Sequence, residues 1–206
     1  MTISCRNLLG AVILVGATTF ITSEVASRQD EPGAGQDAAM EQWKALAEPG
    51  PEHARLTKLV GTWNQDAAHW MYPGAEPNKW TSKGVNEAVL GGRFLTQHVT
   101  GAFEFAGQTF DFEGMGLYGY DNLEQKHFYA WVDNMGTTLT IAEGGTDAAG
   151  NIVYYGTMPD PAGGGSVKVK SVLRFDSESS YTFEMHFEQP DGSWFKNMEV
   201  TSRRAS

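Results

Sequence analysis

Residues 180–203 read SYTFEMHFEQPDGSWFKNMEVTSR, and this stretch decides the fold class. Apolar side chains occupy every second position from Tyr181 to Phe187, with polar side chains between them. Successive side chains of a strand point to opposite faces, so the alternation predicts a strand with one apolar face and with His186 on the other. The PDG at 190–192 carries turn chemistry, and a second run follows it. The stretch predicts an antiparallel hairpin.

The same alternation recurs upstream as far as residue 61. Turn-forming pairs such as Pro73-Gly74 and Asp121-Asn122 separate its runs. Most connections are of hairpin length, which predicts an up-and-down meander, and a meander of this size avoids exposed edges by closing on itself. We therefore predict an all-β fold, an up-and-down antiparallel β-barrel of about ten strands preceded by one or two short helices. The predicted strands are 61–71, 79–90, 93–103, 108–119, 127–134, 137–144, 151–158, 166–175, 180–188 and 194–203.

The first predicted strand places polar residues on its inner face. Its alternation puts Gln65, Ala67 and His69 on the same side as Trp63. A small barrel filled by apolar side chains would not need polar groups there, so the pattern predicts an interior lined for water or a ligand. The alternative is a bulge or a register shift at residues 66–68, which would turn these side chains outward.

Length and charge exclude several classes of protein. The 206 residues suit one all-β domain. The formal charge of -10 argues against a nucleic-acid partner, because such partners need clustered Lys and Arg. An acidic surface also repels anionic lipid head groups. We expect neither nucleic-acid binding nor stable membrane insertion.

The N-terminus has the pattern of a secretory signal peptide over residues 1–27. A polar start at Arg6 precedes an apolar run over 8–21, and small residues follow at 25–27. The run is shorter than the ~20 residues that span a bilayer, so a retained anchor is the weaker alternative. Cys5 lies before the run, where it cannot be a lipid-modified cysteine. We predict a periplasmic or secreted protein with a cleavable signal peptide and no lipobox.

Residues 28–50 are predicted to be a linker that contains a short helix. The chain from 28 to 39 has no apolar periodicity, which is typical of a segment that buries little surface. Helix-forming sequences follow at 38–47 and at 51–60, and Pro51 is well placed to open the second helix. The barrel domain is predicted to span residues 51–206.

The sequence lacks motifs for known chemistry. It contains no nucleophile elbow, His-Glu-x-x-His helix, phosphate loop or dinucleotide fingerprint. The glycines at 163–165 lie between predicted strands with no helix after them, which favours a hairpin tip. The histidines show no metal-ligand spacing, so a metal site would have to assemble across strands. We expect no catalytic residues, no metal and no cofactor. The histidines are His53, His69, His98, His127 and His186.

The sequence WVDNMG at 131–136 is expected at a barrel rim. Asp133 or Asn134 could satisfy backbone donors in an Asx-type turn before Gly136, and this is the ordinary use of these residues together. The alternative is a ligand portal in which Asp133 is an acceptor. Arg93, which follows two glycines, is expected to pair with a surface carboxylate.

Five segments together resemble the bacterial family known as domain of unknown function 1579, over about residues 53–204. The short helix, the Gly-x-Trp at 61–63 and the antiparallel meander that ends in a basic residue are also similar to the calycin superfamily of lipocalins and fatty-acid-binding proteins. The resemblance implies a lipocalin-like barrel in which Trp63 lies at the floor and Arg203 or Arg204 packs across it. It implies no particular reaction. The segments are HARLTKLVGTW (53–63), LGGRFL (90–95), GMGLYGYDN (114–122), WVDNMGTTL (131–139) and NMEVTSRR (197–204).

The resulting hypothesis is a barrel that binds a small apolar or amphipathic molecule. Aromatic side chains with a few polar groups are the usual lining of such sites, and Trp80 is predicted to face inward because Lys79 and Lys83 take the outer face. One alternative is an enzyme that pairs His69 with an inward carboxylate. Another is an interaction or stress-response module with a filled barrel. The sequence does not predict an oligomeric state. The predicted lining residues are Trp63, His69, Trp80, Tyr129 and Trp131.

Overall fold

The computed structural model describes residues 34–160 and 163–206, and these residues form a ten-stranded barrel with two α-helices before it. The all-β prediction is confirmed. The predicted signal peptide and residues 28–33 of the predicted linker lie outside the described residues. The elements are α1 (Ala34–Ala47), α2 (Pro51–Thr57), β1 (Gly61–His69), β2 (Asn78–Val89), η1 (Leu90–Gly92), β3 (Phe94–Phe105), β4 (Gln108–Asp121), β5 (Lys126–Asp133), β6 (Thr140–Thr146), β7 (Ile152–Pro159), β8 (Ser166–Ser177), β9 (Ser180–Glu188) and β10 (Trp194–Arg204).

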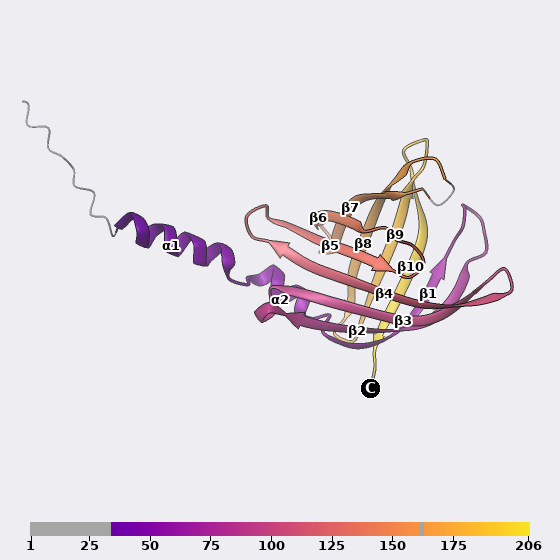
Figure 1. The fold of residues 1–206 in the computed structure, drawn as a ribbon, viewed down its shortest axis with the longest axis horizontal. Helices are drawn as coiled ribbons and strands as arrows, with labels where there is room; N and C mark the ends of the chain where they lie inside the picture. The colour runs from indigo at the N-terminus through magenta and orange to yellow at the C-terminus, as the bar shows by residue number, and fades with distance from the viewer. Residues whose placement is uncertain (1–33, 161–162) are drawn as a thin grey trace, which may run out of the picture. The chain divides into compact units, whose positions relative to one another are not determined.

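The strands form one closed antiparallel barrel in chain order. Each strand pairs with the next, and β10 returns to pair with β1 over Trp63 to His69 (Figure 1). Closure gives every strand two partners, so no edge is left unpaired among the described strands. The register shifts between Lys196 and Met198 in β10 and between Phe175 and Ser177 in β8. The predicted up-and-down meander is confirmed.

The helices differ from their predicted bounds. α1 starts at Ala34 rather than at residue 38, so four residues predicted to be irregular are helical. α2 starts at Pro51 as predicted, since a proline at the first helical position gives up a hydrogen bond that would be missing anyway. Among the described residues, no helix is both long and apolar enough to cross a membrane.

Two side chains fix the junction between the helices and the barrel. Asn122, in the turn after β4, donates to the carbonyl oxygens of Leu46 and Glu48, both at 2.9 Å. Arg93 donates from Nε to the carbonyl oxygen of Ala47 at 2.8 Å, and it also binds the Leu90 carbonyl. The prediction that Arg93 pairs with a surface carboxylate is therefore wrong. Its guanidinium satisfies the Ala47 carbonyl at the end of α1, which is left without a partner inside the helix, and the Leu90 carbonyl in η1.

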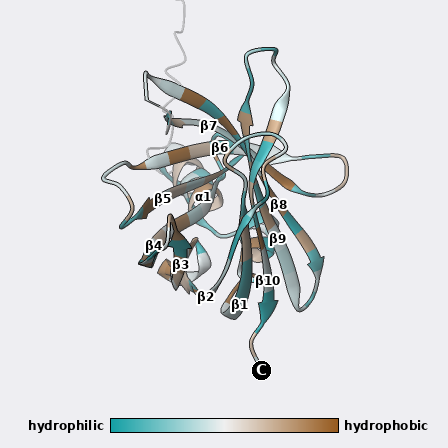
Figure 2. Ribbon diagram, turned by 90° about the vertical axis from the view of Figure 1, so that its right-hand side faces the viewer, coloured by the Kyte–Doolittle hydropathy of each residue, from teal (hydrophilic) through white to brown (hydrophobic). Residues whose placement is uncertain are grey.

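The core gathers at the end of the barrel where α2 lies. Leu56 at the end of α2 and Leu59 just after it are buried with the inward side chains of the strands. The period-two pattern of the strands appears in Figure 2 as hydrophilic and hydrophobic segments alternating along the ribbons. The buried core residues are Leu56, Leu59, Trp63, Leu95, Tyr118, Tyr129, Ala142, Ile152, Tyr154, Leu173 and Tyr181.

Candidate ligand-binding site

The register between strands identifies the side chains that face the interior. Residues directly opposite each other on neighbouring strands point to the same face of the sheet. Starting at Trp63, which is 1% exposed, the pairs lead through Gly84, Val99 and Gly114 to Asp133 on β5. Asp133 therefore faces the interior together with Trp63. The same procedure assigns a face to the paired residues of all ten strands.

Trp63 forms the floor of the barrel. Its indole Nε1 donates to the carbonyl oxygen of Leu59 at 2.8 Å, and the Tyr181 ring packs edge-on with centroids 4.7 Å apart. The Arg204 guanidinium lies 4.3 Å from the Trp63 ring centroid and donates to two backbone carbonyls just before β1. Arg203 instead points outward and pairs with Asp66. Arg204 is therefore the arginine that the calycin resemblance implies.

The polar residue predicted inside β1 is satisfied by serines. Gln65 is 4% exposed, and its amide oxygen accepts from Ser82 at 3.0 Å while its amide nitrogen donates to Ser202 at 3.2 Å. The register of β1 runs without a shift against both neighbours, so the alternative of a bulge at residues 66–68 is wrong. Serine side chains therefore give both polar atoms of Gln65 a hydrogen-bond partner inside the barrel.

Four inward tyrosines form a belt above the floor, defined here as Tyr118, Tyr129, Tyr154 and Tyr181. Gln97 accepts from the Tyr118 hydroxyl at 3.0 Å and donates to that of Tyr181 at 3.3 Å. The Tyr154 hydroxyl is buried and has no hydrogen-bond partner among the described residues. Burial raises the pKa of Tyr118, Tyr129 and Tyr154, so these phenols are neutral donors at physiological pH.

At the other end of the interior the inward side chains are less deeply buried. These side chains lie on the inner face of the barrel, yet they are only half-buried. Solvent therefore reaches this part of the barrel from within, and we call it the mouth. Trp80 packs on Phe103 with centroids 5.7 Å apart, and Phe103 stacks on Phe110 at 5.6 Å. The mouth is lined by His69, Trp80, Phe103, Phe110, Phe112, Trp131, Met158, Met185, Phe187, Phe195 and Met198.

The structure separates the five predicted lining residues into two groups. His69, Trp80 and Trp131 lie at the mouth, where their side chains are half-buried. Trp63 and Tyr129 are 1% and 3% exposed and belong to the packed floor and belt. The mouth therefore brings together three of the five, and the other two lie beneath it.

His69 stands alone among the acid/base candidates of the mouth. Burial lowers its pKa, so the ring is neutral at physiological pH. Within the described residues, the inner face of the strands carries a single carboxylate, Asp133, and no hydrogen bond or ion pair joins it to His69. The arrangement supplies a polar group at the mouth but not the acid/base pair of the enzyme hypothesis.

Two hydrogen bonds from neighbouring residues hold the Asp133 carboxylate in place. Its Oδ2 accepts from the Trp131 indole at 2.9 Å, and its Oδ1 accepts from the backbone N–H of Met135 at 3.0 Å. The second bond is the predicted Asx-type turn. The first fixes the Trp131 ring over Gly114 and Gly116, where an added Cβ at Gly114 would collide with the indole. Glycines on β4 therefore make room for a large flat side chain at the mouth.

A His–Glu pair that the sequence did not reveal lies at the floor end. Nε2 of His127, which is 1% exposed, lies 2.9 Å from the Glu52 carboxylate on α2. Its Nδ1 is buried and has no partner among the described residues. Burial lowers the pKa of His127, and the Glu52 carboxylate opposes that shift. Water does not reach the ring from the mouth, so the pair fastens α2 to the barrel rather than meeting a substrate.

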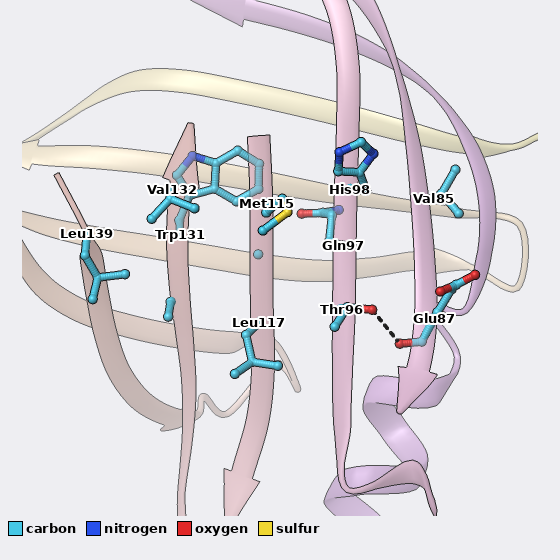
Figure 3. Close-up of a pocket in the computed structure, with 12 residues that line it drawn as sticks. Val85, Glu87, Thr96, Gln97, His98, Met115, Leu117, Trp131, Val132 and Leu139 are labelled. Carbon is cyan, nitrogen blue, oxygen red and sulfur yellow. Dashed lines mark hydrogen bonds between the residues drawn. The ribbon is translucent and has the colours of Figure 1, made fainter. Parts of the chain in front are cut away.

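A groove of about 570 Å³ lies on the outside of the barrel (Figure 3). The register pairs Val85, His98, Met115 and Val132 across β2 to β5 on the face opposite the mouth side chains. Met115 is 54% exposed, and Trp131 of the mouth also lines this outer groove (Figure 3). It is a second location where an apolar molecule could bind, and any test of the mouth must distinguish the two.

Within residues 34–160 and 163–206, three or more His, Cys, Asp or Glu side chains nowhere converge as metal ligands would. The outward His186 illustrates why. It pairs with Glu184 at 3.1 Å on the outer face. Burial is the main cause of its lowered pKa, and the nearby Lys170 and Lys196 lower the pKa further. Cations surround this ring, which disfavours a metal ion there.

Comparison with known proteins places the chain in a family and a fold. The family model described as "Protein of unknown function (DUF1579)" matches residues 48–204. No curated protein matches. Among solved structures, Rv2717c from M. tuberculosis superposes with a TM-score of 0.53 and 14% identity, covering 77% of this chain and 100% of that one. The S-type phycobiliprotein lyase CPES from Guillardia theta superposes with a TM-score of 0.53 and 10% identity, covering 75% and 93%. These likenesses show the lipocalin-like barrel fold.

Proposed function

The chain belongs to the DUF1579 family of proteins of unknown function, and for this member we propose that the barrel binds a small apolar or amphipathic molecule at its mouth. One observation carries the proposal. The interior is packed from the floor to the tyrosine belt, yet its other end presents aromatic and thioether side chains to solvent.

Wet apolar surface inside a barrel is unfavourable without an occupant. Each Å² of apolar surface removed from water contributes about 25 cal/mol, so a ligand that covers the mouth gains from every ring it contacts. The lining of rings and methionines with a few polar groups is the usual composition of a small-molecule site. Methionine side chains adapt to irregular ligands because they are unbranched and polarizable.

We also propose that the protein acts outside the cytoplasm, in the periplasm or as a secreted protein. The support is the signal-peptide pattern at residues 1–27. Cleavage would be tested by intact mass spectrometry of the protein recovered from the periplasm or medium. Recovery of the chain with its N-terminal methionine and leader intact would contradict the proposal.

The test of binding uses two methionines as a matched pair. Met198 faces the mouth and Met115 faces the outer groove. Nile red, an uncharged apolar dye, is titrated into the purified chain, and its fluorescence reports binding. We expect Met198→Asp to weaken binding about tenfold, because a carboxylate in the mouth must lose water as the dye enters. We expect Met115→Asp to bind like the unmodified chain.

Each result has one meaning. Loss of binding in Met115→Asp alone would move the site to the outer groove and contradict the proposal. Absence of dye binding in the unmodified chain would favour the filled-barrel interaction module. Circular dichroism of both variants checks that the barrel has formed.

A further inference from the structure

The helix α1 carries an apolar stripe that is exposed to solvent. The stripe consists of Met40, Trp43 and Leu46, which recur at the spacing of one helix face, and each side chain is at least 40% exposed. An isolated helix shorter than about 15 residues is marginally stable in water, and α1 has 14 residues. A helix of this length with an exposed tryptophan therefore gains stability from a partner surface.

The last turn of α1 is attached to the barrel of its own chain. Arg93 donates to the carbonyl oxygen of Ala47 at 2.8 Å. Asn122 donates to the carbonyl oxygens of Leu46 and Glu48. These bonds use the backbone of the helix end, so they leave the apolar stripe exposed. A second copy of the chain can therefore cover the stripe without breaking them.

The outer groove has the length of such a helix. A row of cross-strand neighbours runs along it from Val85 on β2 through Met115 to Val132 on β5, and Leu139 just before β6 continues the lining (Figure 3). At about 4.8 Å between neighbouring strands, the four spacings from β2 to β6 amount to about 19 Å. The 14 residues of α1 span about 21 Å.

The groove also matches the chemistry of the stripe. An amphipathic helix with apolar anchors three or four residues apart is a recurrent occupant of apolar grooves. Tryptophan and methionine, which α1 presents, are enriched in protein interfaces. The exposed apolar side chains that line the groove are Met115, Leu117, Val132 and Leu139.

We propose that two copies of this chain associate, and that α1 of each copy lies in the outer groove of the other. Each copy carries both surfaces, so a two-fold axis creates two identical contacts. A stable interface buries about 1,600 Å² in total, so each contact has to supply about 800 Å², or about 400 Å² from each surface. Half of the accessible surface of a helix about 21 Å long and about 10 Å wide is of that size. The inference is independent of ligand binding at the mouth.

The test changes one residue in each surface and adds a matched control. Sedimentation velocity of the purified chain, from about 1 to about 100 µM, gives the dissociation constant of the dimer. We expect Trp43→Glu in the helix and Met115→Asp in the groove each to raise that constant at least tenfold, because a carboxylate must lose its water in the contact. Met71→Asp changes another exposed methionine, between β1 and β2 and outside the groove, and should leave the constant unchanged.

Mixing the two variants restores one of the two contacts. Neither variant can form an intact contact with itself, whereas the unmodified helix of Met115→Asp fits the unmodified groove of Trp43→Glu. We expect the mixture to form a heterodimer at least tenfold more tightly than either variant forms a dimer. Native mass spectrometry identifies the heterodimer when one of the two variants is labelled with ¹⁵N. Circular dichroism checks that each variant has folded.

The other outcomes overturn the inference. A purified chain that stays monomeric throughout this concentration range forms no such dimer. A dimer that is weakened only by Met115→Asp would place two outer faces against each other, and one that is weakened only by Trp43→Glu would place two helices together. A mixture without a heterodimer would exclude the reciprocal contact. None of these results bears on the mouth, where Nile red binding is tested separately.

Discussion

The two halves of the barrel interior are built from the same alternating pattern, but their inward side chains are buried in one half and only half-buried in the other. At the floor end, Leu56 and Leu59 from the α2 region close over Trp63, and every core side chain there is buried. At the mouth, the inward rings such as Trp80 and Phe103 remain half-buried. The comparison teaches that one half of the interior carries most of the packing, whereas the other half is the one that the proposed binding would use. Matched substitutions in the two halves can test that division.

The largest contrast is expected between two tryptophans. Trp63→Ala removes a ring that is 1% exposed together with its bond to the Leu59 carbonyl, so we expect the free energy of unfolding to fall by about 3–5 kcal/mol. Trp80→Ala at the mouth should lower it by about 1 kcal/mol, because part of that surface is already exposed to solvent. Urea denaturation of each variant gives both values. Equal losses would mean that the halves are equally packed.

A smaller contrast is expected between two glycines. Gly114→Ala places a methyl group against the Trp131 ring, and we expect a loss of about 1–3 kcal/mol with a shifted tryptophan emission spectrum. Gly145→Ala adds its methyl group where no atom lies within 4 Å, so its stability should change by less than about 0.5 kcal/mol. An unshifted emission spectrum in Gly114→Ala would contradict the placement of Trp131.

Two adjacent arginines provide the next comparison. Arg204→Ala removes the cation from the Trp63 face and frees two backbone carbonyls, so we expect a loss of about 1–2 kcal/mol. Arg203→Ala breaks an ion pair with Asp66 in which both side chains are 62% exposed, and solvent screening should limit the loss to about 0.5 kcal/mol or less. Chemical denaturation at low and high salt separates them, because only the exposed pair should respond to salt.

The smallest effect is expected from pH. Burial lowers the pKa of His127 in the folded chain below its ordinary value of 6.5, although Glu52 partly offsets the shift. The unfolded chain therefore binds a proton at higher pH than the folded chain does. Stability from this group is complete above pH 6.5 and is lost as the pH falls through that value toward the folded pKa. The pKa values of His53, His69 and His186 are lowered too, so the same direction holds for them.

The urea midpoint is measured from pH 7.5 down to pH 5 to check this expectation. His127→Gln should reduce the acid sensitivity of the chain, because a ring that resists protonation has been removed. His98→Gln, at an exposed position on the outer face, is the control and should leave the profile as it is. A steeper acid loss in His127→Gln would show that the Glu52 contact, rather than burial, dominates.

Local patterns were sufficient to predict the strands. The strand at 180–188 has its predicted bounds, and the inward residues Val169, Ser171 and Leu173 of β8 are buried as the alternation predicts. These features depend on neighbours one or two residues away, which the sequence displays directly. The choice between Arg203 and Arg204 needed the register, since only Arg204 is opposite Trp63.

The candidate site was predicted less completely than the fold. His69, Trp80 and Trp131 reach the mouth, whereas Trp63 and Tyr129 lie in the packed half. The sequence analysis also missed the hydroxyl of Tyr154. Its position on the inward face follows from alternation along β7, but its lack of a hydrogen-bond partner depends on side chains that other strands bring near it, which alternation does not reveal.

The sequence by itself determined an alternating meander, its turns, and a first strand with polar groups on the side of Trp63, because each depends on short-range periodicity. Only the tertiary structure decided which inward side chains are packed and which are wet. That outcome depends on where α2 covers the end of the barrel and on which residues become neighbours when the barrel closes. β1 and β10, for example, pair although more than a hundred residues separate them in the sequence. Periodicity sets the face of a side chain, whereas closure sets its neighbours and therefore its chemistry.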